Sequence, residues 1–235
     1  MGAIFKREMK AFFTSPIAYI FIAIFWFIAG IYFVFLNLGS ATTDMSYVFS
    51  GVFIFVLILI PLLTMRLFAD EKKLKTDQCL LTAPVSLSGI VFGKFFSALC
   101  VFLCAMVIYI PFVIVLRVLA GSLAMAQIVG NFTGLLLVGA SFISIGIFIS
   151  SLTEMQIISA IVSIIVNFVL YMIDVFASSV TWEPLKKAMV AIGFYNRYVE
   201  FTQGIFNITS VIFFISVIFI FSFLTVRVLE KRRWS

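Results

Sequence analysis

The chain has 235 residues, of which 64% are hydrophobic and only 11% are charged, and its formal net charge is +6. A soluble domain is typically about half apolar and about a quarter charged, so this chain has more apolar surface than one core can bury. The composition excludes an ordinary soluble domain. It indicates an all-α protein that crosses a membrane, because helices satisfy their own backbone hydrogen bonds in lipid.

The residue types also limit the chemistry. The chain has no histidine, which excludes histidine-dependent catalytic sites, and its carboxylates are too scattered to suggest a metal site. The run from Gly89 to Lys94 is one residue too short for a phosphate-binding loop, and Phe95 stands where such loops have Ser or Thr. We therefore expect no catalytic, cofactor-binding or metal-binding residues. Basic residues at the ends of apolar runs favour membrane topology over nucleic-acid binding.

Residues 1–15 are predicted to form an amphipathic helix. Its apolar residues, spaced at i, i+4, i+7 and i+8, are Phe5, Met9, Phe12 and Phe13. Its basic residues, which face elsewhere, are Lys6, Arg7 and Lys10. A helix with this pattern lies along the membrane surface, and Pro16 separates it from the first span. The alternative is a simple charged flank that orients the first span.

Six apolar runs have the roughly 20 residues that a membrane span needs. They are Ile17–Leu38, Tyr47–Leu67, Phe92–Leu119, Ile128–Leu152, Gln156–Phe176 and Ile208–Val228. Only Thr153–Met155 separates the fourth run from the fifth, so these two form a tight hairpin. Twelve of the 16 basic residues fall on one side of the resulting topology. This asymmetry predicts that both chain ends are cytoplasmic.

The central parts of these runs carry no charge. Lys94 lies near an inner end, whereas Arg117 and Asp174 lie near outer ends, from which the side chains can reach the membrane surface. An ion-coupled transporter usually needs an ionisable group at the midplane, so the pattern counts against a secondary transporter. Small residues in the fourth run, such as Gly134 and Gly139, favour close packing within the chain over a seam between chains.

The longest cytoplasmic connection is residues 66–88, and Arg66–Thr82 is predicted to be one helix. Glu71 and Lys75 have the spacing of a favourable helical ion pair, and Pro84 ends the helix. The residues assigned to one face are Leu67, Leu74, Gln78 and Leu81. Because a solvated linker needs no apolar face, the pattern favours a docking surface for a partner protein.

The extracytoplasmic stretch, residues 177–207, contains two short amphipathic patterns separated by Gly193. The first consists of Leu185, Met189 and Ile192, and the second of Phe194, Tyr198 and Phe201 with Arg197 and Glu200 on the polar side. Two short helices of this kind lie on the outer leaflet or dip into it.

Four stretches, in order along the chain, carry a resemblance to a known family. They are Lys6–Pro16 (KREMKAFFTSP), Met65–Ser86 (MRLFADEKKLKTDQCLLTAPVS), Phe201–Gly204 (FTQG) and Arg233–Trp234 (RW). Together they resemble the permeases of type-2 ABC exporters, most closely the subgroup that includes gliding-motility-associated and nitrous-oxide-reductase-maturation permeases. The resemblance covers the whole chain. One departure is that the family usually has Gly-Thr where this chain has Lys75-Thr76.

The resemblance implies a single permease domain over residues 1–235 that forms the translocation path with a second copy or a similar chain in the cell membrane. It also implies separate ATPase subunits that bind ATP and magnesium, so this chain itself would not be an enzyme. Membrane lipid is a further expected partner, as is an extracytoplasmic accessory protein.

The resemblance also assigns roles to three groups of residues. The group expected to couple to the ATPase is Arg66, Leu67, Asp70, Glu71, Leu74, Lys75, Gln78 and Leu81. The interfacial helix, expected to flank the same ATPase, contributes Phe5, Lys6, Arg7, Met9, Lys10, Phe12 and Phe13. The expected outer lid is Trp182, Leu185, Met189, Tyr195, Arg197, Tyr198, Glu200, Phe201 and Gly204.

Two other classes of function remain open at this point. One is a non-transporting membrane anchor or signal transmitter coupled to an ATPase. The other is a self-contained channel or secondary transporter, against which the uncharged midplane argues.

Overall fold

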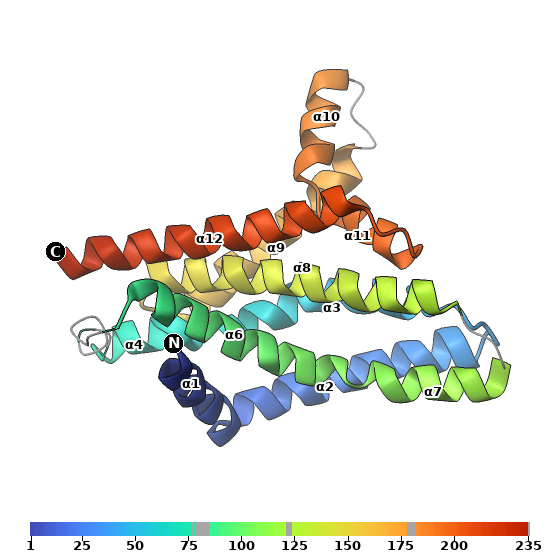
Figure 1. Cartoon of the computed structure of the whole chain (residues 1–235), viewed down its shortest axis with the longest axis horizontal. Coiled ribbons are helices and arrows are strands. Elements are labelled where there is room, and N and C mark those ends of the chain that lie inside the picture. Colours follow the sequence, from blue (N-terminus) through green and yellow to red (C-terminus); the bar gives the residue numbers. More distant parts are fainter. Residues whose placement is uncertain (77, 79–84, 121–123, 178–181, 235) are drawn as a thin grey trace.

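The computed structural model describes residues 1–76, 78, 85–120, 124–177 and 182–234. The chain begins with α1 (Gly2–Thr14), which lies obliquely across one end of the helical bundle (Figure 1). Ser15 has extended backbone angles, and α2 (Pro16–Tyr32) begins at Pro16, whose fixed φ suits the first position of a helix. The predicted break between the N-terminal helix and the first span is therefore confirmed. A π-helical segment, η1 (Phe33–Leu38), completes this span.

The second and third spans are each made of two helices. α3 (Ser46–Thr64) is followed at once by α4 (Arg66–Lys73), and α6 (Leu87–Met106) is followed by α7 (Tyr109–Ala120). The break in the third span lies just before Pro111, which has no N–H to donate to the carbonyl of Val107. That carbonyl accepts instead from the Ile110 N–H, three residues on, at 3.0 Å.

The second half of the chain forms a hairpin, two short helices and a final span. The hairpin is α8 (Met125–Leu152) and α9 (Gln156–Ala177), the short helices are α10 (Glu183–Ile192) and α11 (Tyr195–Thr202), and the last span is α12 (Ile208–Trp234). α10 projects from the side of the bundle, whereas α4, α1 and the end of α12 lie at one end of the long axis (Figure 1).

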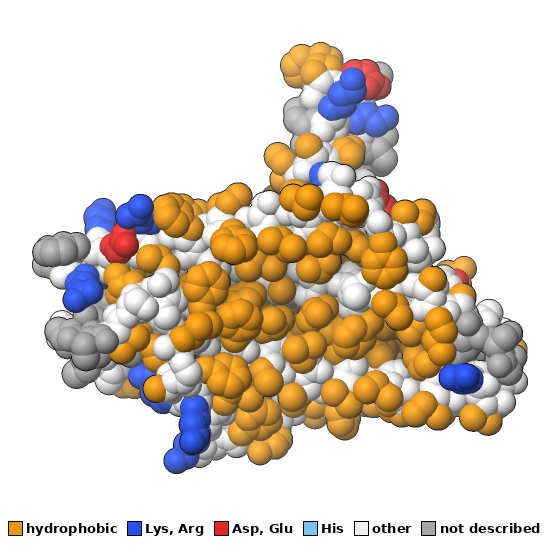
Figure 2. Space-filling view, viewed as in Figure 1, with side chains coloured by type: hydrophobic (Ala, Val, Ile, Leu, Met, Phe, Trp, Pro, Cys, Tyr) orange, Lys and Arg blue, Asp and Glu red, His pale blue; other side chains and the backbone are white. Residues whose placement is uncertain are grey.

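Within the described residues, six helical segments are long and apolar enough to cross a membrane. They are Pro16–Leu38, Ser46–Lys73, Leu87–Leu119, Met125–Leu152, Gln156–Ala177 and Ile208–Arg233. The described residues contain no strand, so the predicted all-α fold with six spans is confirmed. Figure 2 shows apolar side chains along the length of the bundle, with Lys and Arg mainly at the end that holds α4 and on α10.

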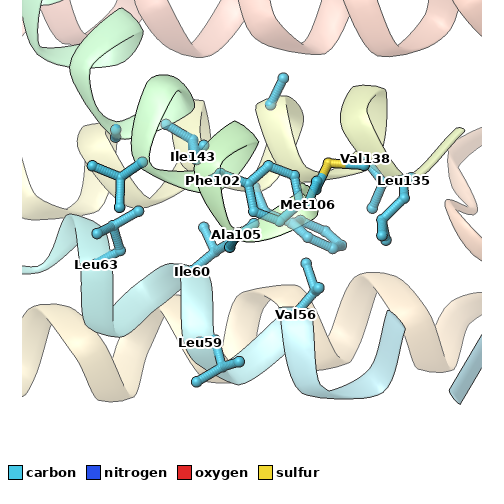
Figure 3. Close-up of a cluster of buried hydrophobic side chains, with 14 of the residues drawn as sticks. Val56, Leu59, Ile60, Leu63, Phe102, Ala105, Met106, Leu135, Val138 and Ile143 are labelled. Carbon is cyan, nitrogen blue, oxygen red and sulfur yellow. The ribbon is translucent and has the colours of Figure 1, made fainter. Parts of the chain in front are cut away.

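The core is built around α8, the most enclosed of the spans. Side chains of α3, α6 and α8 interdigitate there, with Phe102 and Met106 of α6 lying between the other two helices (Figure 3). Glycine makes this possible, because a Cβ at Gly139 would come within 2.2 Å of the Phe102 ring. Close packing of the fourth span within the chain is confirmed at this position.

Candidate coupling site

The candidate coupling site begins with the short helix α4, whose N-terminus is capped by another helix. The preceding residue, Met65, makes no side-chain cap. The Ser150 hydroxyl of α8 accepts from the N–H groups of Phe68 and Ala69, each at 3.1 Å, and donates to the Met65 carbonyl at 2.9 Å. One serine therefore satisfies backbone groups that a helix start leaves without partners, and it anchors α4 to the central helix.

The first residues of α4 face the rest of the chain. Arg66 donates to the Ser15 hydroxyl at 2.9 Å and to the carbonyl of Ala11 at 3.1 Å, and it lies over the Phe12 ring. Its positive charge is favourable there because the carbonyl end of α1 is the negative end of the helix dipole. Leu67 is buried and Arg66 is half-buried, so these two residues fasten α4 to the rest of the chain.

A buried lysine lies behind α4. Lys94 of α6 is only 1% exposed, and its ammonium lies 3.1 Å from Glu8 Oε1 of α1 and 3.0 Å from Glu71 Oε1 of α4. It also donates to the Leu67 carbonyl at 2.6 Å. Arg7 pairs with both carboxylates from the solvent side. We call Arg7, Glu8, Glu71 and Lys94 the charge tetrad.

The charge tetrad keeps the Glu8 carboxylate ionised. Burial of Glu8 by itself raises the pKa of its carboxyl, but the positive charges of Lys94 and Arg7 outweigh burial and keep this pKa below its usual value. For Arg7, burial lowers the pKa, whereas its contacts with Glu8 and Glu71 raise it more, so the guanidinium stays charged. Two basic and two acidic side chains therefore form a cluster of balanced formal charge, in which Lys94 is buried and Arg7 reaches the surface.

The predicted single helix from Arg66 to Thr82 is wrong. α4 ends at Lys73, residues 74–76 form a turn, and Lys75 has a φ of 55°, in the left-handed region that glycine adopts most easily. Glu71 pairs with Arg7 and Lys94 and not with Lys75. The expected common face also fails, because Leu67 is buried whereas Leu74 is 70% exposed.

The part of α4 and its turn that remains accessible is small. Lys73, Leu74, Lys75, Thr76 and Gln78 are exposed, and Asp70 is partly so. Leu81 lies outside the described residues. The exposed residues 73–76 form what we call the α4 tip.

A notch adjoins the α4 tip. It has a volume of about 330 Å³ and is lined by Lys73 together with Glu154, Met155, Gln156 and Ile157 from the turn between α8 and α9. The same turn meets the last span, because Arg232 lies 3.8 Å from Glu154. The structure therefore brings the short inner connection beside α4, which makes one continuous surface of two segments far apart in sequence.

The buried face of α1 differs from the predicted apolar stripe. Ile4, Glu8 and Phe12 are buried, whereas Phe5, Met9 and Phe13 are only partly so, and Lys6, Arg7 and Lys10 are exposed. Glycines of α6 allow this close packing, because a Cβ at Gly93 would lie 3.0 Å from Ile4 and one at Gly89 would lie 3.7 Å from the backbone nitrogen of Met1. The run Gly89–Lys94 thus seats α1 and supplies the buried lysine.

At the opposite end of α9, Asp174 performs a similar capping role. Its carboxylate accepts from the N–H groups of Tyr195 and Asn196, at 2.6 and 3.4 Å, and from the Asn196 side chain at 2.9 Å. Asp174 is 5% exposed, so the expectation that it reaches the membrane surface is wrong. It is held inside because it caps the N-terminus of α11, where Phe194 makes no side-chain cap.

The residues predicted for the outer lid divide between two environments. In α11, Tyr198 and Phe201 are fully buried, and the Tyr198 ring stacks on Phe53 of α3 with centroids 4.8 Å apart. α11 is therefore part of the core. Three other residues of α11, Tyr195, Arg197 and Glu200, are half-buried, and Gly204 follows the helix with a φ of 76°. Trp182 is exposed before α10, which contains Leu185 and Met189.

The contacts at the end of the bundle that holds α4 are helix caps, ion pairs and close packing. Within the described ranges, no group of three or more cysteine or acidic side chains is placed to hold a metal ion. Sequence reasoning missed Glu8, Lys94 and Ser150 as parts of the site. One signal was available for Glu8, because it lies at i+4 from Ile4 and at i−4 from Phe12, on the face that packs.

Comparison with known proteins identifies one family. The family model described as "ABC-2 family transporter protein" matches residues 6–174, which is most of the chain and includes most of α1, all of α4 and the charge tetrad. A comparison with curated proteins found no match.

Proposed function

Since this chain belongs to the ABC-2 transporter family, we propose that it is the permease subunit of an ATP-binding cassette exporter in the cell membrane. In this proposal the translocation path is formed with a second copy or a similar chain. Separate ATPase subunits, which bind ATP and magnesium, lie on the cytoplasmic side with both ends of this chain. The order of the sequence motifs supports the gliding-motility and nitrous-oxide-reductase-maturation subgroup.

The observation that carries the proposal is the α4 tip. Leu74 is 70% exposed at the end of a helix whose other residues are fastened to α1, α6 and α8. An isolated apolar side chain on a rigid, exposed turn suits docking into a partner, because little conformational freedom is lost on binding. Because these contacts hold α4 against the spans, a displacement of the α4 tip must move the spans.

The notch beside the tip adds to the proposed docking surface. An ATPase that receives Leu74 would also face Lys73 and the turn at Glu154–Gln156, which line the same notch. An ATPase docked on both segments would move α4 and the α8–α9 hairpin together. The connection Thr153–Met155 therefore contributes to docking although it is short.

The proposal is tested by capture of an ABC-type ATPase on the purified chain in nanodiscs. The wild-type chain is expected to hydrolyse no ATP alone and to capture an ABC-type ATPase. Leu74→Asp should weaken capture roughly tenfold or more, since it places a charge at the centre of the contact. Trp182→Asp, at an equally exposed position outside the spans, is the matched control and should capture normally. Equal capture by the Leu74 variant would contradict this docking site.

A further inference from the structure

The charge tetrad joins three elements through one ammonium group. The Lys94 ammonium donates to Glu8 Oε1 and to the Leu67 carbonyl, and it forms an ion pair with Glu71 Oε1, all within 3.1 Å. The first acceptor belongs to α1 and the other two belong to α4, whereas Lys94 itself belongs to α6. None of the three elements can move away alone without losing a contact to this group.

The charges strengthen this connection most at α4 and α6. The cluster contains two basic and two acidic side chains, and Arg7 closes its outer side by pairing with both Glu8 and Glu71. Withdrawing α4 or α6 would leave the remaining charges unbalanced, which is strongly unfavourable in a buried site. Withdrawing α1 would remove Arg7 and Glu8 together, and Lys94 and Glu71 would then lose the partners that α1 supplies.

A purely stabilising role does not explain the use of charge here. Well-packed apolar residues often stabilise a buried site as well as an ion pair does, whereas charge-assisted hydrogen bonds also impose direction and distance. The tetrad lies at the base of the α4 tip, since Glu71 is two residues before Lys73. Movement of the tip reaches α6 and α1 through this cluster.

We propose that Lys94 is the positioning residue that makes α1, α4 and α6 move as one unit when a partner displaces α4. That an ATPase displaces α4 rests on the proposed function. The connection of α1, α4 and α6 through Lys94 rests on the contacts in the structure alone. Two experiments separate these parts.

The first experiment uses the chain by itself in nanodiscs. Lys94→Met keeps a long apolar stem but leaves two carboxylates facing one guanidinium. Hydrogen exchange of the α1 amides should become roughly ten- to hundredfold faster, with α12 unchanged. Lys6→Met, which removes an exposed charge from α1, is the control and should exchange like the wild type. Unchanged exchange in the Lys94 variant would overturn the connection.

The second experiment uses the complex with the captured ATPase. The double variant Lys94→Met/Glu71→Gln leaves Arg7 paired with Glu8, so charge balance and folding should return without the three-way connection. Spin labels at Lys10 and Lys231, in a background lacking native cysteines, report the distance from α1 to α12 with and without ATP. The wild type should show an ATP-dependent change, and the double variant should bind the ATPase but lose that change.

The outcomes of the second experiment are distinguishable. A double variant that binds ATPase and shows the wild-type distance change would overturn the role of Lys94, because the elements would then move together without it. A wild-type chain that captures no ATPase would instead contradict the proposed function, while the exchange result on the chain alone would still stand.

Discussion

Lys94 and Asp174 are charged residues within apolar spans, and each is accommodated by partners from other elements. Lys94 meets two carboxylates and a carbonyl, and Asp174 accepts three hydrogen bonds from the start of α11. A lone charge in such surroundings would be costly, so the position of each side chain is tied to the position of its partners. At the scale of single residues, these groups make the relative placement of helices specific.

The lowered pKa of Glu8 predicts that docking of α1 depends on pH. The docked state of α1 binds fewer protons than the detached state, because the pKa of Glu8 is lower when α1 is docked. The contribution of Glu8 to the stability of the docked state is therefore fully present above the usual carboxyl pKa of about 4.3, and it is lost as the pH falls through the lowered pKa. A spin label at the exposed residue Ala3 should become more mobile between pH 5 and pH 3. Glu8→Gln should abolish most of this transition. A label whose mobility is constant to pH 3 in the wild type would refute the prediction.

The cap supplied by Ser150 is the second residue-scale prediction. Ser150→Ala removes the acceptor for two N–H groups of α4 and should destabilise this helix by about 1 kcal/mol. The adjacent Ser151 provides a matched control, because its hydroxyl donates only to the Phe148 carbonyl of its own helix. Hydrogen exchange of the α4 amides in the two variants measures the difference. Equal effects of the two substitutions would contradict the capping role.

At the scale of elements, the two short helices α4 and α11 share one design. Each lacks a side-chain cap from its own preceding residue, and each receives one from a membrane span, Ser150 for α4 and Asp174 for α11. A helix of eight residues is only marginally stable by itself, so packing and such caps determine whether it forms. These contacts also fix where each helix sits against the bundle.

The contact between α9 and α11 depends on a glycine. A Cβ at Gly193 would lie 1.8 Å from Asp174 Oδ1, so Gly193→Ala should push α11 from its cap and destabilise the protein by about 1–3 kcal/mol. Gly30→Ala in α2 is the control, because nothing lies within 4 Å of the added Cβ. Thermal unfolding in nanodiscs compares the two. A Gly193 variant as stable as the Gly30 variant would show that α11 is not held in this way.

At the scale of the whole molecule, the inner machinery is concentrated at one end. α1, α4, the α8–α9 turn and the end of α12 lie there, together with most exposed Lys and Arg side chains, whereas α10 projects elsewhere (Figures 1 and 2). A displacement applied to this end would reach several spans at once.

This arrangement predicts the topology. A single cysteine at Lys73 should react with a membrane-impermeant reagent only from the cytoplasmic side, and one at Lys187 only from outside, because both side chains are exposed and lie on opposite sides of α9 in the predicted topology. Native cysteines are replaced first. Labelling of the Lys73 variant in intact cells would reverse the assigned orientation.

The sequence by itself determined the class of protein, the number of spans and the existence of α1, α10 and α11. These features follow from local patterns, because the length of an apolar run and its period decide whether a segment can lie in lipid or at its surface. The interfacial position of α1, the lid and the ATPase contact stay predictions. The run Gly89–Lys94 lies within α6, and the sequence alone did not predict that it packs against α1.

Only the tertiary structure decided which charges are buried and where α4 ends. Glu8 and Lys94 are 86 residues apart, so no local pattern reports that they meet. The apolar face predicted for Arg66–Thr82 assumed one continuous helix, whereas Ser150 and Lys94 fix the first turns of α4 and the helix then ends in a turn with Lys75 at a positive φ. Burial of a polar group depends on partners that packing brings together, and packing is a property of the whole bundle.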